Sequence, residues 1–141
     1  MILPDVNVLV YAFRPDADKH SEYKRWLETI INGSAAYGVS AQVLSGFVRI
    51  CTHRRVFARP SLLDDVLQFC NVLREQPNAT VVAPGERHWS IFEMLCRRSK
   101  ASGNLAQDAW FAALAIESGC EWITTDTDYA KFPDLRWRRP F

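Results

Sequence analysis

The sequence predicts an α/β protein built on a mostly parallel sheet. Short apolar runs that suit buried strands alternate with longer stretches whose apolar residues recur at helical spacing. Such alternation indicates βαβ units wound into one sheet. No internal repeat and no linker rich in Pro, Gly or Ser divides the 141 residues. We therefore expect a single domain over residues 1–141, long enough to bury a substantial core.

Strands are expected where the apolar runs are short and end at polar or turn-forming residues. The expected strands cover residues 2–4, 37–40, 80–83 and 122–125, with a fifth at a sheet edge over residues 135–137. Asp5 follows the first of them directly, and Pro84-Gly85 forms the turn after the third. The sheet should therefore hold four or five strands.

Helices are expected where apolar residues recur every three or four positions. The expected helices cover residues 20–31, 43–50, 61–73, 89–95 and 105–117, and a further apolar run spans 8–13. Asn32-Gly33 ends the first helix, and Gly119 follows the last at a position that favours a glycine cap. The polar stretch 97–103 is expected to link the last two helices.

Composition excludes several classes of protein. With a net charge of +1 the chain is no polycation, so any attraction for nucleic acid must come from local patches. The four cysteines show no C-x-x-C spacing, which argues against a zinc site or a disulfide framework and favours buried thiols in a reducing compartment. The N-terminus has no basic segment before its apolar run. We expect a cytoplasmic protein with no membrane association.

Four carboxylates occur beside the ends of the apolar runs, and they are the main clue to function. Asp5 follows the first strand, Asp108 lies near the start of an alanine-rich helix, and Asp126 and Asp128 follow the fourth strand. Ligands of parallel α/β sheets bind just outside the carboxyl ends of the strands. Acids gathered there repel one another unless a cation lies between them. Hard oxygen ligands favour Mg²⁺ or Mn²⁺, and hence chemistry on phosphate.

Each acid also has a purely structural interpretation. Asp5 could cap the helical turn that follows it, although its position at the end of a buried strand favours a ligand. Asp108 is expected in the first turn of its helix, where the helix dipole alone would favour it. Of Asp126 and Asp128, one is expected to be a ligand and the other a turn former, and we favour Asp126 as the ligand. Asn7 is a possible accessory residue that orients Asp5 or a phosphate, or else a turn residue.

Basic residues form three candidate patches for RNA. The first comprises Arg49, Arg54, Arg55 and Arg59, the second Arg97, Arg98 and Lys100, and the third Arg136, Arg138 and Arg139. A solvated charged face is the ordinary explanation for any of them. Phe57, His53 and Trp137 are interleaved with these cations, and aromatic rings and guanidinium planes stack on unpaired bases. We take Arg49, Arg54 and Arg55 as candidate RNA-binding residues.

Four segments in order resemble the motifs of the PIN-domain family, and within it the VapC-type toxins of prokaryotic toxin–antitoxin pairs. Residues 5–9 (DVNVL) are similar to the opening D-x-N motif, and the other three motifs match 43–49 (VLSGFVR), 104–109 (NLAQDA) and 124–129 (TTDTDY). The closing 132–137 (FPDLRW) also resembles the tail of such toxins. The resemblance covers the whole chain, and the four spacings together are more specific than any motif alone.

The resemblance implies a three-layer α/β/α sandwich and a Mg²⁺-dependent endoribonuclease that cuts structured RNA such as tRNA or rRNA. Its catalytic and metal-binding residues would be Asp5, Asp108 and Asp126, with Asn7 and Asp128 as possible accessories. It further implies a cognate VapB-type antitoxin that blocks the site, and a homodimer. Mn²⁺ is an alternative ion.

One departure from the family pattern supports an alternative to this function, and a third interpretation is argued from Asp5 alone. The second motif normally supplies a glutamate where this chain has Gly46, and no other acid lies within helical reach. The protein could then be a catalytically weak module that binds RNA or antitoxin without cutting. A phosphatase or receiver protein that uses Asp5 as a phosphorylated nucleophile is disfavoured, because haloacid-type phosphatases need an aspartate where Asn7 stands.

Overall fold

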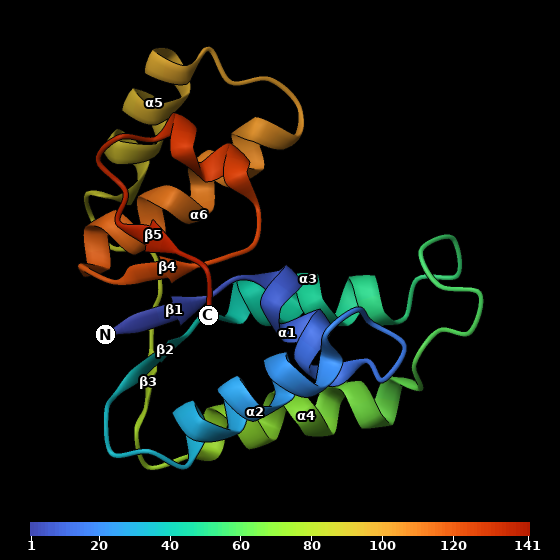
Figure 1. Ribbon diagram of the computed structural model, residues 1–141. Helices are drawn as coiled ribbons and strands as arrows, with labels where there is room; N and C mark the ends of the chain where they lie inside the picture. The colour runs from blue at the N-terminus through green and yellow to red at the C-terminus, as the bar shows by residue number, and fades with distance from the viewer.

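A computed structural model describes residues 1–141 and contains one parallel sheet of five strands in the order β3-β2-β1-β4-β5 (Figure 1). The strands are β1 (Ile2–Pro4), β2 (Tyr37–Val39), β3 (Ala79–Val81), β4 (Glu121–Ile123) and β5 (Trp137–Arg138). All four strand pairs are parallel. The expected α/β class and the expected number of strands are confirmed, as is the position of the last strand at a sheet edge.

Six α-helices and one short 3-10 helix connect the strands. They are α1 (Val6–Phe13), α2 (His20–Ile31), α3 (Ala41–Cys51), α4 (Leu63–Glu75), α5 (His88–Ser99), α6 (Asn104–Ser118) and η1 (Thr127–Lys131). Figure 1 shows them in two groups, α5 and α6 in one and α1 to α4 in the other. None of the helices has the combination of length and apolar composition that a membrane-spanning segment needs.

The pairing of β1 with β4 brings two distant segments to the same point of the sheet edge. Pro4 lies opposite Ile123, and the Asp5 amide donates to the Ile123 carbonyl over 2.8 Å. The next residue of each strand, Asp5 and Thr124, therefore leaves the sheet beside the other. Since side chains alternate between the two faces of a strand, a slip of one residue would separate them.

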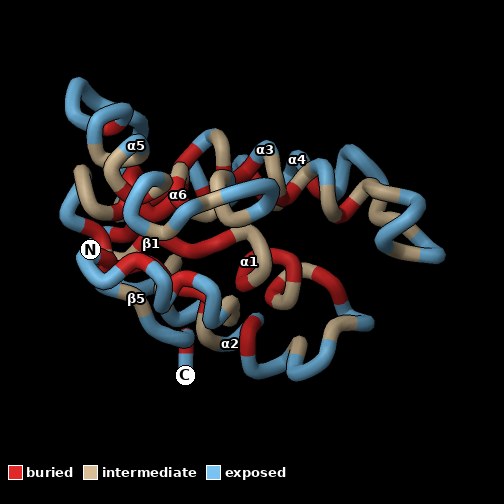
Figure 2. Tube along the Cα trace, turned by 90° about the horizontal axis from the view of Figure 1, so that it is seen from above, coloured by how far each residue is buried: buried red, intermediate tan, exposed pale blue.

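The helix α6 packs closely because small residues make up much of its buried face. Ala109, Ala112, Ala113 and Ala115 are fully buried. The Phe111 ring stacks on Trp122 of β4, with the ring centroids 5.5 Å apart, and Trp122 in turn packs against Tyr129 of η1. Figure 2 shows buried chain along β1 and α6. This packing fixes α6 and η1 relative to the strand ends.

Two sequence-based expectations about helix boundaries are wrong, and one helical element was not expected. The helix α5 extends to Ser99, so Arg97 and Arg98 lie on a helix and not in a link. The helix α6 begins at Asn104, which moves Asp108 beyond the first turn and away from the terminal dipole. The segment after β4 turns into η1 at Thr127, a 3-10 helix that no apolar pattern indicated.

Candidate active site

Asp5 lies at the junction of β1 and α1 and is almost completely buried, with 6% of its surface exposed. Its Oδ1 accepts a hydrogen bond from the Val6 amide over 2.6 Å, so the residue does cap α1. Its Oδ2 accepts from the Thr124 hydroxyl over 2.6 Å and from the Asn7 amide over 3.2 Å. The capping role and a position beside the other acids are thus compatible.

Thr124 connects Asp5 to Asp126, a role that the sequence did not suggest. Its hydroxyl donates to Asp5 and accepts from the Asp126 backbone amide over 3.1 Å. Asn7 supports the same connection, because its side chain donates to the Thr124 hydroxyl over 3.2 Å and accepts from the Thr125 amide over 3.4 Å. Asn7 belongs to α1 and is not a turn residue. Its amide contacts Asp5, as one of the two alternatives for this residue proposed.

Asp108, Asp126 and Asp128 offer carboxylate oxygens that all lie within 4.8 Å of one another. We call these three residues the carboxylate trio. Asp126 accepts from the Asp128 amide over 2.8 Å and so caps η1, while Asp128 pairs with Lys131 at 2.9 Å. The structure brings Asp108 and Asp126 together as expected and adds Asp128, which the sequence suggested only as an accessory. Asp5 lies outside the trio.

The acids influence one another electrostatically in this structure. Burial raises the pKa of Asp5 to about 6, and the negative charges of Asp108 and Asp126 add to the increase, while hydrogen bonds from Thr124 and Val6 oppose it. Burial likewise raises the pKa of Asp108 to about 6, with further contributions from Asp126 and Asp128. A cation among these oxygens would reverse the repulsion. The donor set, carboxylates alone, suits a hard divalent ion.

Tyr129 of η1 is a neighbour of the acids that the sequence did not identify. Its side chain is 1% exposed and lines the same cleft as Asp5, Asp108 and Asp126. Burial raises the pKa of its phenol, and the negative charges of these three aspartates raise it further. The hydroxyl is therefore protonated at any physiological pH and is a hydrogen-bond donor beside the acids.

A cleft of about 960 Å³ runs past the acids. Its acidic lining comprises Asp5, Asp108 and Asp126, and its other side includes Gly46 and Arg49 of α3 together with Val56 and Phe57 of the following loop. Gly46 lies close to α1, because a Cβ on it would be 3.1 Å from Val6 Cγ2. The position at which the family pattern expects a glutamate thus faces the cleft and contributes no acid to it.

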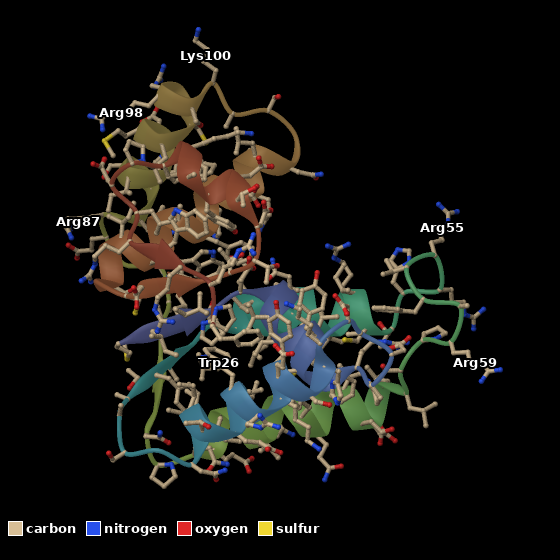
Figure 3. All side chains as sticks on the ribbon, viewed as in Figure 1. Trp26, Arg55, Arg59, Arg87, Arg98 and Lys100 are labelled. Carbon is tan, nitrogen blue, oxygen red and sulfur yellow. The ribbon has the colours of Figure 1, made fainter.

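The three candidate basic patches differ in their ion pairs. Arg97 pairs with Glu93, Arg98 with Asp134 and Arg138 with Glu121, at 2.9, 3.1 and 3.0 Å. The patch that we call the arginine group has no acidic partner within 4.0 Å, and it comprises Arg49, Arg54, Arg55 and Arg59. Arg49 lines the cleft, and Figure 3 shows Arg55 and Arg59 reaching outward from the projecting loop between α3 and α4. Arg49 is the single Arg or Lys that lines the cleft beside the acids, and no carboxylate pairs with it.

Comparison with known proteins identifies relatives over almost the whole chain. The family described as "PIN domain" matches residues 2–135. The VapC ribonuclease Mb2897 of Mycobacterium bovis is 42% identical over 140 residues, which cover 99% of this chain and 95% of that protein. Ribonuclease VapC25 of Mycobacterium tuberculosis is 35% identical over 140 residues, with 99% of each chain covered.

Solved structures share the fold at lower identity. VapBC2 from Rickettsia felis, bound to a DNA fragment from its promoter, aligns with a TM-score of 0.70 at 16% identity and covers 99% of this chain and 98% of the matched one. VapBC-1 from nontypeable Haemophilus influenzae aligns with a TM-score of 0.68 at 18% identity and the same coverage. These likenesses establish the three-layer α/β architecture independently of the close relatives.

Proposed function

The chain belongs to the PIN-domain family, and from this we propose that it is the toxin of a type II toxin–antitoxin pair, an endoribonuclease that hydrolyses RNA phosphodiester bonds with the help of Mg²⁺. The observation that carries the proposal is the carboxylate trio beside buried Asp5, at the carboxyl ends of β1 and β4, in a family whose relatives bear the name ribonuclease. Products would carry a 5′-phosphate and a 3′-hydroxyl.

Asp108 and Asp126 would hold the cation, with Asp128 as a third ligand from η1 and Asp5 as a ligand directly or through water. A bound Mg²⁺ would activate a water for attack on phosphorus and offset charge on the leaving oxygen, and Mn²⁺ is an alternative. Thr124 and Asn7 orient Asp5 through hydrogen bonds that hold its Oδ2 in place. The chain's own contribution is thus a rigid set of oxygens.

The site has enough ligands for Mg²⁺ although position 46 supplies no acid. The trio supplies three carboxylates without α3, and Mg²⁺ retains several waters in protein sites. The alternative, a module that binds RNA or antitoxin without cutting it, has no contact in its favour. We therefore retain hydrolysis as the function.

Partners follow from the chemistry of the surface and from the named neighbours. RNA, in particular structured RNA such as tRNA or rRNA, would be held by Arg49, Arg54 and Arg55, whose guanidinium groups have no acidic partner. The solved neighbours are named VapBC, which supports a VapB-type antitoxin as the partner of this chain. We further propose a homodimer that acts in the cytoplasm, where its RNA would be.

The test is cleavage of total RNA by the purified protein with Mg²⁺ and, separately, with EDTA. We expect cleavage only with Mg²⁺ and its loss, by on the order of 100-fold or more, in Asp108→Asn. Asp64→Asn is the matched control, because Asp64 is an exposed acid in the first turn of α4 and does not line the cleft. Identical RNA profiles with Mg²⁺ and EDTA would refute the proposal.

A further inference from the structure

Arg14 is a buried cation outside the acid site, and all three nitrogens of its guanidinium group donate hydrogen bonds. It caps the C-terminus of α1 and is only 6% exposed. Its guanidinium donates to both carboxylate oxygens of Asp16, over 2.9 and 2.6 Å. Its Nη1 also donates over 3.0 Å to the Arg59 carbonyl and over 3.0 Å to the Ser61 hydroxyl. Arg14 therefore ties the end of α1 to the segment between α3 and α4.

That segment, residues 52–62, we call the α3–α4 loop, and it projects from the body of the molecule (Figure 1). Its chain is ordered by its own hydrogen bonds. The amides of Val56 and Phe57 both donate to the His53 carbonyl over 3.1 Å, and the Ser61 amide donates to the Cys51 carbonyl over 2.8 Å. With Arg14 holding its second half, the loop has a defined conformation although most of its residues are exposed.

Phe57 connects this anchor to the cleft. The Arg14 guanidinium carbon lies 3.7 Å from the centroid of the Phe57 ring, a close cation–π contact that covers one face of the ring. The ring is partly exposed and lines the cleft that contains the acids, beside Val56, which is 49% exposed. The ring also packs against the hydrophobic core, so its orientation is fixed, and its partly exposed side forms part of the cleft wall.

The charges around Phe57 indicate which ligand would cover it. Arg54, Arg55 and Arg59 of the same loop are exposed without acidic partners, and Arg49 lines the cleft. A polyanion would pair with these guanidinium groups. An unpaired base would stack on the ring, since every base has a π-face that stacks on an aromatic side chain. Duplex RNA cannot do both, because its bases already stack within the helix.

We propose that Phe57 is a stacking platform for an unpaired base of the RNA next to the cut, and that Arg14 is the positioning residue that fixes the platform. This inference rests on the proposed function for the identity of the ligand as RNA. A platform of this kind favours RNA whose target site lies in a single-stranded segment. The α3–α4 loop would then contribute part of the specificity for RNA.

Binding of single-stranded RNA to the Asp108→Asn protein isolates the platform from cleavage. Phe57→Leu should raise the Kd about tenfold, because one base loses its stacking partner, and Phe57→Tyr should restore most of the affinity. Phe92→Leu is the matched control, since Phe92 is a partly buried aromatic that packs against Trp89 and Trp110 and does not line this cleft. Equal affinities for Phe57→Leu and the parent would overturn the inference.

A photochemical cross-link locates the base directly. Single-stranded RNA that contains 5-iodouridine is irradiated with the Asp108→Asn protein, and the modified peptide is identified by mass spectrometry. We expect the link at Phe57, and its loss in Phe57→Leu. A link elsewhere, with Phe57→Leu cross-linking as well as the parent does, contradicts a stacked base on this ring.

Arg14 is tested by a split between kinetic parameters in the cleaving protein. Lysine keeps the charge but loses the paired contacts and the flat guanidinium, so Arg14→Lys should raise KM for RNA several-fold and leave kcat unchanged. In the Phe57→Leu background the same change should add little, because both residues act through one ring. A fall in kcat at unchanged KM, or additive effects, would reject the positioning role.

Three further outcomes distinguish the Arg14 anchor, the Phe57 platform and the proposed hydrolysis. If Arg14→Lys unfolds, Asp16→Asn weakens the same anchor from its exposed side and should raise KM in the same direction. If the parent protein cuts no RNA yet Phe57 still cross-links, the proposed hydrolysis fails while the platform stands. If RNA is cut normally and Phe57→Leu leaves KM unchanged, the platform alone fails.

Discussion

The carboxylate trio and the arginine group border the same cleft but are built in different ways. The trio joins α6 to the segment after β4, and Thr124 connects it to Asp5, which lies 119 positions away in the sequence. The arginine group comes from one continuous stretch, the end of α3 and the loop that follows. The acids depend on strand register and packing, whereas the arginines need only the end of α3 and one loop held in place by Arg14.

The two regions also differ in what the fold does with their charge. Asp5 and Asp108 are withdrawn from water beside like charges, which raises the pKa of each carboxyl to about 6. The guanidinium groups of Arg54 and Arg55 remain in solvent, where a like-charged neighbour is screened. The aspartates thus repel one another at a place where a small cation would relieve the repulsion. The arginines stay solvated at a place where a long flexible polyanion would bind.

The largest effect is expected on RNA cleavage, when one acid of the carboxylate trio is replaced. Asp126→Asn should lower cleavage by on the order of 100-fold or more. It should leave the affinity for RNA unchanged or higher, because a negative charge near phosphate is lost. The double variant with Asp108→Asn should be no worse than either single one, since ligands of one ion act as a unit. Gel-based cleavage rates and fluorescence anisotropy measure the two quantities, and a matched loss of affinity would contradict the separation.

The next effect concerns stability without metal. The pKa of Asp5 is about 6 in the folded protein against 3.8 as its ordinary value, so the folded state binds the proton more tightly. The free energy of unfolding should therefore fall as the pH rises from about 4 to about 6. Asp5→Asn should be more stable than the parent by about 2–3 kcal/mol at pH 8 and by almost nothing at pH 4.

Urea unfolding at both pH values in EDTA measures this difference. Asp64→Asn is again the control, since Asp64 is exposed and its replacement should not change the pH dependence. Added Mg²⁺ should narrow the gap by stabilising the parent selectively. A parent protein whose stability is independent of pH between 4 and 8 would contradict the raised pKa of the buried carboxyl.

A smaller effect is expected on RNA affinity and its salt dependence, when two residues of the arginine group are replaced. Arg54→Gln/Arg55→Gln should weaken RNA binding several-fold and lower the slope of log Kd against log salt by about 1.4, or about 0.7 for each phosphate contact to a single strand. The control Arg97→Gln/Arg98→Gln removes the same charge from residues already paired with Glu93 and Asp134. If both pairs changed the slope equally, net charge and not the arginine group would account for binding.

The smallest effect is expected on stability and cleavage when Gly46, which lines the cleft, is replaced. Gly46→Ala gains helix propensity but places a methyl group 3.1 Å from Val6 Cγ2, so we expect a net change in stability below about 1 kcal/mol. Cleavage should stay within twofold, because the added group has no ligand atom. Thermal unfolding and the cleavage rate measure the outcome, and a large loss of activity would assign Gly46 a function that needs its missing side chain.

The sequence predicted the sheet and most helices because their apolar patterns are strong. It missed the end of α5 because Arg97 and Arg98 are polar, although a helix with an exposed face tolerates arginine there. It missed η1 because a 3-10 helix depends on local capping, here by Asp126, and not on an apolar period. Boundaries set by capping and hydrogen bonds are not visible in periodicity.

The candidate site was predicted in kind but not in arrangement. Strand ends indicated where acids gather, yet nothing in the sequence pairs Thr124 with Asp5 or brings Tyr129 against Asp108. These contacts depend on the β1–β4 register and on the packing of α6. The same holds for Arg14, whose partners Arg59 and Ser61 lie 45 and 47 positions away. Single-residue chemistry can be inferred from position, whereas partnerships require the fold.

The attachment of the α3–α4 loop has a consequence for how such proteins diversify. The loop joins the body at its two ends, through Arg14 and through Phe57, which packs against the core, and none of the four acids belongs to it. A related protein's loop, grafted with its own counterpart of the Arg14 contact, would change which RNA is gripped while the hydrolytic machinery stayed intact. If the loop selects the RNA as proposed, target choice and hydrolysis would change independently, and one fold would serve toxins with different targets.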